Sequence, residues 1–500
     1  MKDGTLFEKA TSASAGIVEI GNRKQLFLDD LLVDEASRIS RFMYRPDKYP
    51  GNPILEAREP WEMGKLRTGR VAGVEITGQT AIYDQEDQIF KMWYLGWPLE
   101  DGLRPWCYAT SANGYDWERP ELGIYDFAGS TRNNIMFAAA DPNYFNVFKD
   151  PRDPDPRRLY KAQGEVEGPI SNTTGGAINA YSPDGVHWSE HPGNPVVNHG
   201  RNFADASTVL GWDPKRQKYV GYFRPGHPLG HEIDGIGRHR HIRTIGYSES
   251  DDFEQWTPTR IMLAPDHLSR VDHQFMQFTA GIYGDFYVGF LMLHQTHEQT
   301  WETFLLSSRD GFHWTWVDRH VPFLSYGELG SYDAGYMTPS GPILHDGTIW
   351  VYYGSFRGAH GYDPVKRGRA AGDQPNMSIA LATLPEDRWA GLLAGPNQGL
   401  LVTKPLIFKG SRLKLDIHAS VPHGKPGKIP NFDECDVRAA ISDQSGMPFD
   451  GFDFEHSTRI RATGVHEISW DGRSLRRLEG ETVRLRLEMR NCCLCSLQFH

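Results

Sequence analysis

The stretch "SSRDGFHW" at residues 307–314 reads as a tight turn that follows a strand and ends in tryptophan. Asp and Gly favour tight turns because Asp bonds to the backbone two residues on and Gly adopts positive φ without strain. Three further stretches keep the same order of residues: "SANGYDW" at 111–117, "SPDGVHW" at 182–188 and "SDDFEQW" at 250–256. They recur every ~60 to 70 residues, a period that indicates a repeat architecture.

Each repeat has the same arrangement of apolar segments ahead of its tryptophan. In the third repeat these are "STVLGWDPKRQ", "KYVGYFRP" and "IRTIGYS", and a fourth, outer strand fits after Trp256. Apolar alternation between turn residues predicts a strand in each case. A weaker fifth repeat ends at Trp389. Four strands in each of five repeats predict an all-β fold, a five-bladed β-propeller whose tryptophans pack between neighbouring blades.

The flanks of the repeats differ from them in pattern. We expect the propeller to span residues 61–398, and residues 399–500 to form a C-terminal β-sandwich because stretches such as "ETVRLRLEMR" alternate apolar and polar residues. Residues 1–60 include "GIVEIGNRKQLFLDD" and "SRISRFMYRP". We expect N-terminal strands there that pack on the propeller or complete a blade.

Charge and cysteine content limit the partners. A net charge of −11 gives no reason to expect nucleic acid or an anionic membrane. No apolar run approaches the roughly 20 residues of a membrane span, and the N-terminal stretch lacks the apolar region of a secretory signal. The 5 cysteines are an odd number and include "CCLC" at 492–495, so they predict no disulfide framework. These observations favour a cytoplasmic protein and leave a homo-oligomer open.

Carboxylates recur where the inner strands of the predicted blades begin. The loops that enter these strands crowd around one mouth of a propeller, so they can build a pocket without any continuous motif. The candidate catalytic acids are Glu75, Asp205, Asp272, Glu328 and Asp333. The second repeat has Asn143 and Asn146 at the equivalent place. Acids gathered near one axis split their pKa values, which suits the acid and the nucleophile or base of glycosidic bond cleavage.

A salt bridge is the structural alternative for any single acid. Arg67, Arg70 and Arg243 are the candidate partners. We also expect Arg70 and His273 to contact a substrate at the mouth. Aromatic side chains that stack on sugar rings are predicted at Trp97, Trp106, Tyr332 and Tyr336.

The histidine-rich stretches "GHEIDGIGRHRHIRT" and "MLHQTHEQTWE" are the remaining candidates for chemistry. His239 and His241 are two apart and face one side of a strand, but nothing completes a ligand set. We interpret both stretches as polar, partly exposed segments. The sequence therefore predicts no metal and no cofactor.

Together, the five repeats, the C-terminal sandwich, the acids at the inner strands and the Ser-x-Asp-Gly-x-x-Trp turns resemble the five-bladed glycoside hydrolases. These include the invertase/levanase-like and the arabinanase/xylosidase-like families. The resemblance covers roughly residues 60 to 395 and implies three acids from different blades, which act as nucleophile or base, transition-state stabiliser and general acid. The Asn-Asp-Pro-Asn stretch of the invertase-like group is absent from residues 60–80, so the chain looks like a divergent branch. Sialidases have one more residue between the Asp and the Gly of the turn, and six blades.

By position, the resemblance implies that Glu75 in "AGVEITG" is the first-blade acid and Asp205 in "FADAST" the acid of a middle blade. Glu328 or Asp333 would be the proton donor or a ligand of sugar hydroxyl groups. We therefore expect a glycoside hydrolase that acts on a small carbohydrate substrate, with a furanoside such as a fructoside or an arabinofuranoside as a candidate.

Two alternatives stay open. One is a glycosyltransferring or phosphorolytic propeller; a phosphorylase would need a cationic phosphate site, which Arg238 and Arg240 could supply. A carbohydrate-binding propeller without catalysis would use the same acids to bind sugar hydroxyl groups.

Overall fold

The computed structural model describes residues 16–64, 71–97, 104–139, 142–166, 176–197, 205–224, 226–233, 239–360, 375–419 and 435–500. Within these ranges, only the backbone is described for residues 139, 142–144, 165–166, 205–207, 226–233 and 239–241. The described residues form strands and short 3₁₀ helices and no α-helix. The chain divides into two compact units, Met1–Tyr44 with Glu386–His500, and Arg45–Pro385.

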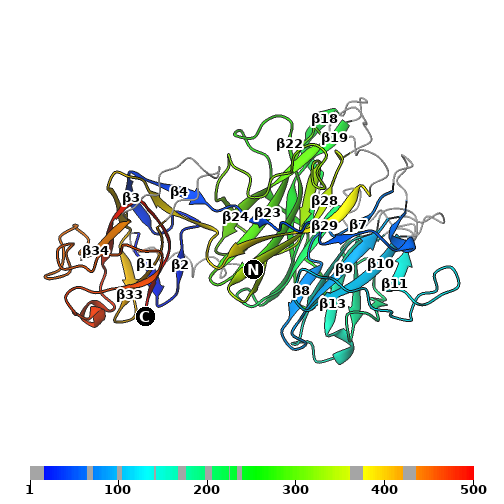
Figure 1. Cartoon of the computed structure of the whole chain (residues 1–500), viewed down its shortest axis with the longest axis horizontal. Helices are drawn as coiled ribbons and strands as arrows, with labels where there is room; N and C mark the ends of the chain where they lie inside the picture. The colour runs from blue at the N-terminus through cyan, green and yellow to red at the C-terminus, as the bar shows by residue number, and fades with distance from the viewer. Residues whose placement is uncertain are drawn as a thin grey trace, which may run out of the picture. The chain divides into compact units, whose positions relative to one another are not determined.

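The unit Arg45–Pro385 contains five antiparallel sheets that follow one another along the chain (Figure 1). The first consists of β7 (Val74–Glu75), β8 (Ala81–Asp84), β9 (Ile89–Gly96), β10 (Arg104–Ser111) and β11 (Ile135–Ala139). The second consists of β12 (Pro142–Lys149), β13 (Tyr160–Val166), β14 (Gly176–Ser182) and β15 (Ser189–Glu190). The third consists of β16 (Asp205–Asp213), β17 (Lys218–Arg224), β20 (Ile245–Ser250) and β21 (Arg260–Leu263).

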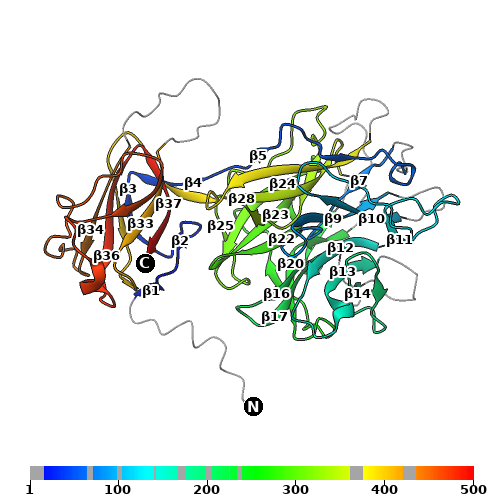
Figure 2. The ribbon, with the colours of Figure 1, turned by 60° about the horizontal axis from the view of Figure 1, so that its bottom comes forward.

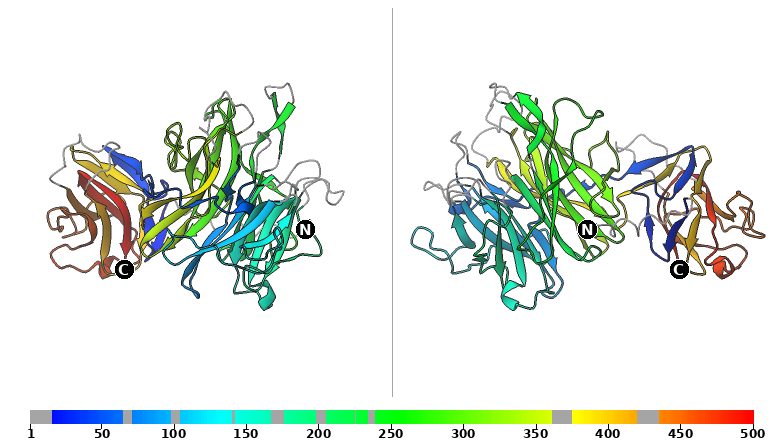
Figure 3. Two further views of the ribbon diagram at one scale, coloured as in Figure 1. Left: turned by 45° about the vertical axis from the view of Figure 1, so that its right-hand side comes forward. Right: turned by 180° about the vertical axis from the view of Figure 1, so that it is seen from behind.

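The fourth sheet consists of β22 (His273–Tyr283), β23 (Phe286–Gln295), β24 (Thr300–Ser308) and β25 (Thr315–Trp316). The fifth consists of β26 (Tyr336–Pro339), β27 (Ile343–His345), β28 (Thr348–Phe356) and β29 (Met377–Pro385), to which β5 (Asp47–Lys48) and β6 (Leu55–Glu56) add from the N-terminal side. A separate hairpin of β18 (Gly226–Ile233) and β19 (His239–Arg243) projects beyond the third sheet (Figure 3). The 3₁₀ helices η1 (Pro60–Glu62) and η2 (Pro156–Arg158) lie in connections.

Five buried clusters join these sheets in cyclic order. The cluster around Trp93 lies between the first and second sheets, and the one around Tyr219 lies between the second and third. The cluster around Tyr222 lies between the third and fourth sheets, and the one around Trp301 lies between the fourth and fifth. The remaining cluster, around Tyr352, joins the fifth sheet to the first. Each sheet is therefore covered on both faces, which explains why β23 is buried along nearly all of its length.

In the first four sheets the repeated turn connects the third and fourth strands, and in each turn the Asn or Asp side chain accepts hydrogen bonds from two backbone N–H groups. In the second sheet, the backbone N–H of Gly185 donates to Ser182 Oγ at 2.8 Å, and those of Val186 and His187 donate to Asp184 Oδ1. Burial alone would raise the pKa of Asp184, but the hydrogen bonds from His187 and Val186 lower it to about 2. The motif is thus a self-bonded turn, as the sequence predicts.

Glycine is favoured at this position of the turn for two reasons. Its φ is +77° at Gly114, +81° at Gly185 and +74° at Gly311. In addition, a Cβ at Gly114 would lie 2.7 Å from the ring of Trp350. The third sheet has Phe253 at φ +67° instead, and its ring packs between Phe148 and Tyr219 of the cluster beside it.

The carbonyl group of this glycine position links the first, second and third sheets each to the sheet that precedes it in the cyclic order. Trp93 Nε1 donates to Gly185 O at 2.6 Å, and the amide of Asn179 donates to Phe253 O. The hydroxyl group of Tyr352, in the fifth sheet, donates to Gly114 O in the first sheet at 2.9 Å. The repeat therefore supplies one inter-sheet acceptor per turn, in addition to the packing of its tryptophan.

A second kind of link lies at the end of the inner strands. Asp150, which follows β12, accepts hydrogen bonds from Lys161 Nζ at 2.6 Å and from the hydroxyl group of Tyr219 in the next sheet at 2.5 Å. The hydroxyl group of Tyr287 bonds Asp213 across the next boundary in the same way, at 2.6 Å. These buried carboxylates are satisfied by hydrogen bonds, which offsets their desolvation.

The other unit consists of two antiparallel sheets and one parallel pair. One sheet contains β35 (Gly464–Ile468), β33 (Leu413–His418), β37 (Cys492–Phe499), β30 (Ala390–Ala394), β4 (Ile39–Met43) and β2 (Gln25–Leu26). The other contains β3 (Val33–Ser37), β31 (Gly399–Thr403), β36 (Arg484–Arg490) and β34 (Asp436–Ser442). β1 (Val18–Gly21) pairs with β32 (Leu406–Phe408), and η4 (Leu475–Leu478) is a 3₁₀ helix.

These two sheets share one buried core, with β34 and β36 beside β33 and β37 (Figure 2). All five cysteines are free thiols and buried, and three of them lie on β37. The boundaries of this unit, after Tyr44 and before Glu386, differ from those expected at residues 60 and 398. Strands β1 to β4 of the N-terminal segment belong here, whereas β5 and β6 belong to the fifth sheet of the other unit.

Removing the hydroxyl group of Tyr352 tests the link between the fifth and first sheets. Tyr352→Phe leaves the buried carbonyl group of Gly114 without its donor, so we expect a loss of about 1–3 kcal/mol in the free energy of unfolding. Guanidinium unfolding followed by tryptophan fluorescence measures it. Tyr125→Phe is the control, because the hydroxyl group of the half-buried Tyr125 makes no hydrogen bond within the described part of the chain. Equal unfolding midpoints for both variants would contradict the prediction.

Candidate active site

Glu75 is the predicted acid with the environment of a proton donor. It is the last residue of β7, where it pairs with Leu95 of β9, and its side chain is half-buried. Trp97 Nε1 donates a hydrogen bond to Glu75 Oε2 at 2.8 Å and so fixes the orientation of the carboxyl group. The guanidinium group of Arg104 stacks over the ring of Trp97 at 4.9 Å and holds the indole in turn.

The protonation of Glu75 follows from this environment. Burial raises the pKa of Glu75 to about 7, although the hydrogen bond from Trp97 and the charge of Arg104 oppose the rise. A carboxyl group with that pKa is about half protonated at neutral pH, so it can both donate and accept a proton there.

An aromatic and methionine cluster adjoins the Glu75–Trp97 pair. Trp97 packs against a buried cluster that includes Trp301, Tyr336 and Phe356. The ring of Tyr336 stacks on Phe356 at 3.8 Å and lies 4.0 Å from Trp301. The structure thus brings the predicted residues Trp97 and Tyr336 to one cluster. It adds Trp301 and Phe356, which sequence patterning could not separate from ordinary core aromatics.

A buried histidine lies beside the same cluster. His294 on β23 is 1% exposed, and its ring lies 5.6 Å from Trp301 and 5.5 Å from His360. Burial, together with the neighbouring His360 and Arg243, lowers the pKa of His294 to about 2, so the imidazole is neutral at physiological pH. The sequence interpretation of "MLHQTHEQTWE" as a polar, partly exposed segment is therefore wrong for His294.

Two other predicted acids are held by cations. Asp333 is 1% exposed and its Oδ2 lies 2.5 Å from Lys48 Nζ of β5, while Ser331 Oγ donates to its other oxygen at 2.9 Å. Asp272 pairs with Arg270 at 3.1 Å in the segment before β22. Both contacts are salt bridges, the structural alternative considered from the sequence. Their partners are Lys48 and Arg270, not the expected Arg67, Arg70 or Arg243.

The remaining predicted acids differ in position. Glu328 is exposed, in the segment before β26. Asp205 is the first residue of β16 and pairs with Arg224 of β17 through the backbone, but its side chain lies outside the described residues. Arg70 also lies outside them.

The predicted substrate contacts are similarly dispersed. His273 opens β22, is half-buried, and has a pKa lowered by that burial. The hydroxyl group of Tyr332 lies 3.1 Å from that of Tyr353 and accepts a hydrogen bond from Asn52 at 3.1 Å. Trp106 is 1% exposed in the cluster between the first and second sheets, where its ring packs against Phe145.

No group of three or more His, Cys, Asp and Glu side chains that could hold a metal occurs in the described ranges. The side chains of His239 and His241 are not among those described. Within those same ranges, no helix has the length and hydropathy to cross a membrane.

No family model matches the sequence, and no curated protein matches it. Several solved structures are similar to this chain at low identity. A structure of an N-acetylgalactosamine deacetylase from F. plautii in complex with blood group B trisaccharide covers 71% of this chain and 97% of its own, at 13% identity and a TM-score of 0.42. A glycosyl hydrolase from Bacteroides ovatus covers 68% and 94%, at 12% identity and a TM-score of 0.42.

A structure described with the GH130 family of mannoside phosphorylases, which contains glycoside hydrolases that target β-1,2 mannosidic linkages in Candida mannan, covers 68% of this chain and 94% of its own. Its identity is 14% and its TM-score 0.42.

The raised pKa of Glu75 has a measurable effect on stability. Because burial disfavours the ionised form, the stability that Glu75 contributes is complete below its ordinary pKa of 4.5 and is lost as the pH rises through about 7. Relative to Glu75→Gln, the native chain should therefore lose on the order of 2 kcal/mol of unfolding free energy between pH 4 and pH 8. Urea unfolding at both pH values measures this. Glu118→Gln, at an exposed glutamate of the same sheet region, controls for a general charge effect; a parallel pH response in the two variants would contradict the assignment.

Proposed function

We propose that the unit Arg45–Pro385 is a five-bladed β-propeller that hydrolyses a glycosidic bond, with Glu75 as the general acid. The observation that carries this proposal is the state of Glu75: a half-buried carboxyl group, oriented by Trp97, whose pKa is about 7. A general acid with a pKa near the working pH transfers its proton most effectively. The five sheets in cyclic contact support the propeller, and the shared core of the other unit supports a β-sandwich.

Glycosidic cleavage also needs a second carboxylate. We assign this role to Asp205, because it opens the inner strand β16 of the third sheet and so comes from a different blade than Glu75. Glu75 would donate its proton to the glycosidic oxygen as the bond to the anomeric carbon breaks. Asp205 would then act on the anomeric carbon as nucleophile, or on a water molecule as base.

The salt bridges of Asp333 and Asp272 support positioning roles for these two acids. A carboxylate whose oxygens are held by a cation is fixed in position, which suits the binding of sugar hydroxyl groups or the fixing of a loop. Trp97, which is half-buried and bonded to Glu75, offers a flat apolar face for the C–H face of a sugar ring.

The activity test is release of sugar from aryl furanosides, aryl pyranosides and fructo- and arabino-oligosaccharides. Glu75→Gln should lower kcat/KM by about 10² to 10⁴-fold, because the variant loses general acid catalysis. Substrates with a good leaving group, such as a nitrophenol, should be affected least, since they need little protonation. Glu118→Gln is the matched control and should keep full activity. Full activity in a folded Glu75→Gln protein would contradict the assignment of Glu75 as the general acid.

The pH profile gives an independent check. Since the acid must be protonated, kcat/KM for the native enzyme should fall as the pH rises above about 7, following the pKa of Glu75. The variant Glu75→Gln should lack this alkaline limb. Release that requires inorganic phosphate would identify a phosphorylase instead, and sugar binding without release would identify a binding propeller.

The variant Asp205→Asn tests whether Asp205, and not Asp272 or Asp333, is the second carboxylate. We expect a loss of at least about 10³-fold in kcat/KM for every leaving group, because the anomeric carbon loses its nucleophile or base. Asp272→Asn and Asp333→Asn should act mainly through KM or stability. A larger kcat loss in either of these than in Asp205→Asn would transfer the role to that residue.

A further inference from the structure

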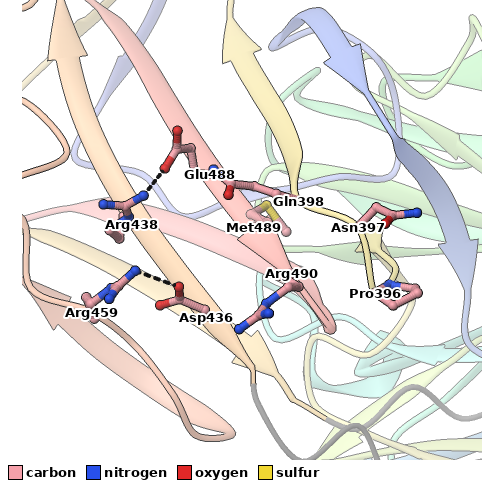
Figure 4. A pocket seen from close by; sticks show the side chains of 9 residues that line it. All are labelled: Pro396, Asn397, Gln398, Asp436, Arg438, Arg459, Glu488, Met489 and Arg490. Atoms are coloured by element: carbon pink, nitrogen blue, oxygen red, sulfur yellow. Dashed lines mark hydrogen bonds and ion pairs between the residues drawn. The ribbon is translucent and has the colours of Figure 1, made fainter.

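A polar pocket lies on the outer face of the sheet formed by β3, β31, β36 and β34, within the unit that contains the C-terminal residues (Figure 4). Its volume is about 340 Å³, within the lower range of small-ligand sites. It is lined by Pro396, Asn397, Gln398, Asp436, Arg438, Arg459, Glu488, Met489 and Arg490.

Strand register explains why these charged side chains meet. In the β34–β36 pair, Asp436 lies opposite Arg490, and Arg438 lies opposite Glu488. The residues between them, Val437 and Met489, are fully buried in the core of the unit. Because side chains alternate across a strand, the four charged residues all project from the opposite face.

The guanidinium and carboxylate groups are positioned by one another. Arg438 donates to Glu488 Oε2 at 2.6 Å, and Arg459 donates to Asp436 Oδ2 at 3.0 Å, as the dashed lines in Figure 4 mark. Together with Arg490, the lining contains three guanidinium groups and two carboxylates, so its formal charge is positive. A positively charged lining favours an anionic ligand.

The remaining wall is a turn that carries amides. Asn397 and Gln398 lie between β30 and β31 and are exposed, so their side chains can both donate and accept hydrogen bonds. Pro396 is the exposed apolar member of the lining, whereas the side chain of Met489 is buried in the core, and neither offers an aromatic face. Recognition in this pocket therefore depends on directed polar contacts.

We propose that this pocket binds a hexuronate, a sugar ring that carries a carboxylate. The carboxylate would bind the guanidinium groups around Arg490 in the fork geometry that arginine favours. The ring hydroxyl groups would bond the amides of Asn397 and Gln398 and the oxygens of Asp436 and Glu488. A ring of that size fits the volume, and the site is separate from the proposed catalytic residues, which belong to the other unit.

The test is a calorimetric and saturation-transfer NMR titration of the full chain with D-glucuronate and D-galacturonate. The neutral sugars D-glucose and D-galactose, and inorganic phosphate, are titrated beside them. We expect millimolar binding of at least one hexuronate and at least tenfold weaker binding of its neutral counterpart. If the neutral sugar binds as tightly as the hexuronate, the proposed role of the carboxylate is wrong. If inorganic phosphate binds as tightly as the hexuronate, the pocket does not recognise the sugar ring, and the proposal is overturned.

Variants locate the binding. Arg490→Gln should weaken hexuronate binding at least tenfold, and Asn397→Ala should weaken it less. Arg486→Gln, on the same face of β36 but outside the pocket lining, is the matched control and should bind normally. Glu75→Gln should also bind normally, so a failed glycosidase assignment leaves this result intact. Absence of hexuronate binding, or binding that Arg490→Gln does not change, would overturn the proposal.

Discussion

The hydrogen bond that each repeated turn accepts from the preceding sheet is the interaction on which the larger unit depends. A turn closed by its own Ser and Asp side chains holds one carbonyl group rigidly at its tip, and a buried donor from the neighbouring sheet reaches it. The acceptor is the carbonyl group of the residue with positive φ at the tip of the turn. Local turn chemistry thereby sets the spacing between sheets, and the aromatic side chains fill what lies between them.

This constraint also accounts for the position of the candidate acid. Glu75 ends a two-residue strand that pairs with β9, and the first sheet is in turn fixed to the fifth by Tyr352 and the cluster around it. The side chain of Trp97, one residue beyond β9, is therefore held close enough to bond Glu75. Desolvation by these neighbours changes the acid chemistry of Glu75, whereas Asp333, which is buried to a greater degree, is paired with Lys48 and serves a different role.

Much of the strand pattern was accessible from the sequence, because alternation and turn residues are local signals. "KYVGYFRP" corresponds closely to β17, and "SPDGVHW" links β14 to β15 as predicted. Long-range pairings were not accessible. Nothing near Asp333 indicates Lys48 as its partner, and His294 looks polar and exposed until neighbouring sheets cover both faces of β23. Phe253 departs from the glycine pattern, since its ring packs in a cluster that forms only when the second and third sheets meet.

The addition of β5 and β6 to β29 has a consequence for biosynthesis. These two short strands are among the first parts of their unit to be made, yet their hydrogen-bonding partner is the last of its strands to leave the ribosome. Until β29 emerges, the nascent chain exposes unpaired strand edges together with the apolar faces of the first and fifth sheets, the kind of surface that invites aggregation. Chains cut short before β29 should therefore need chaperone protection, since only the finished unit joins its beginning to its end.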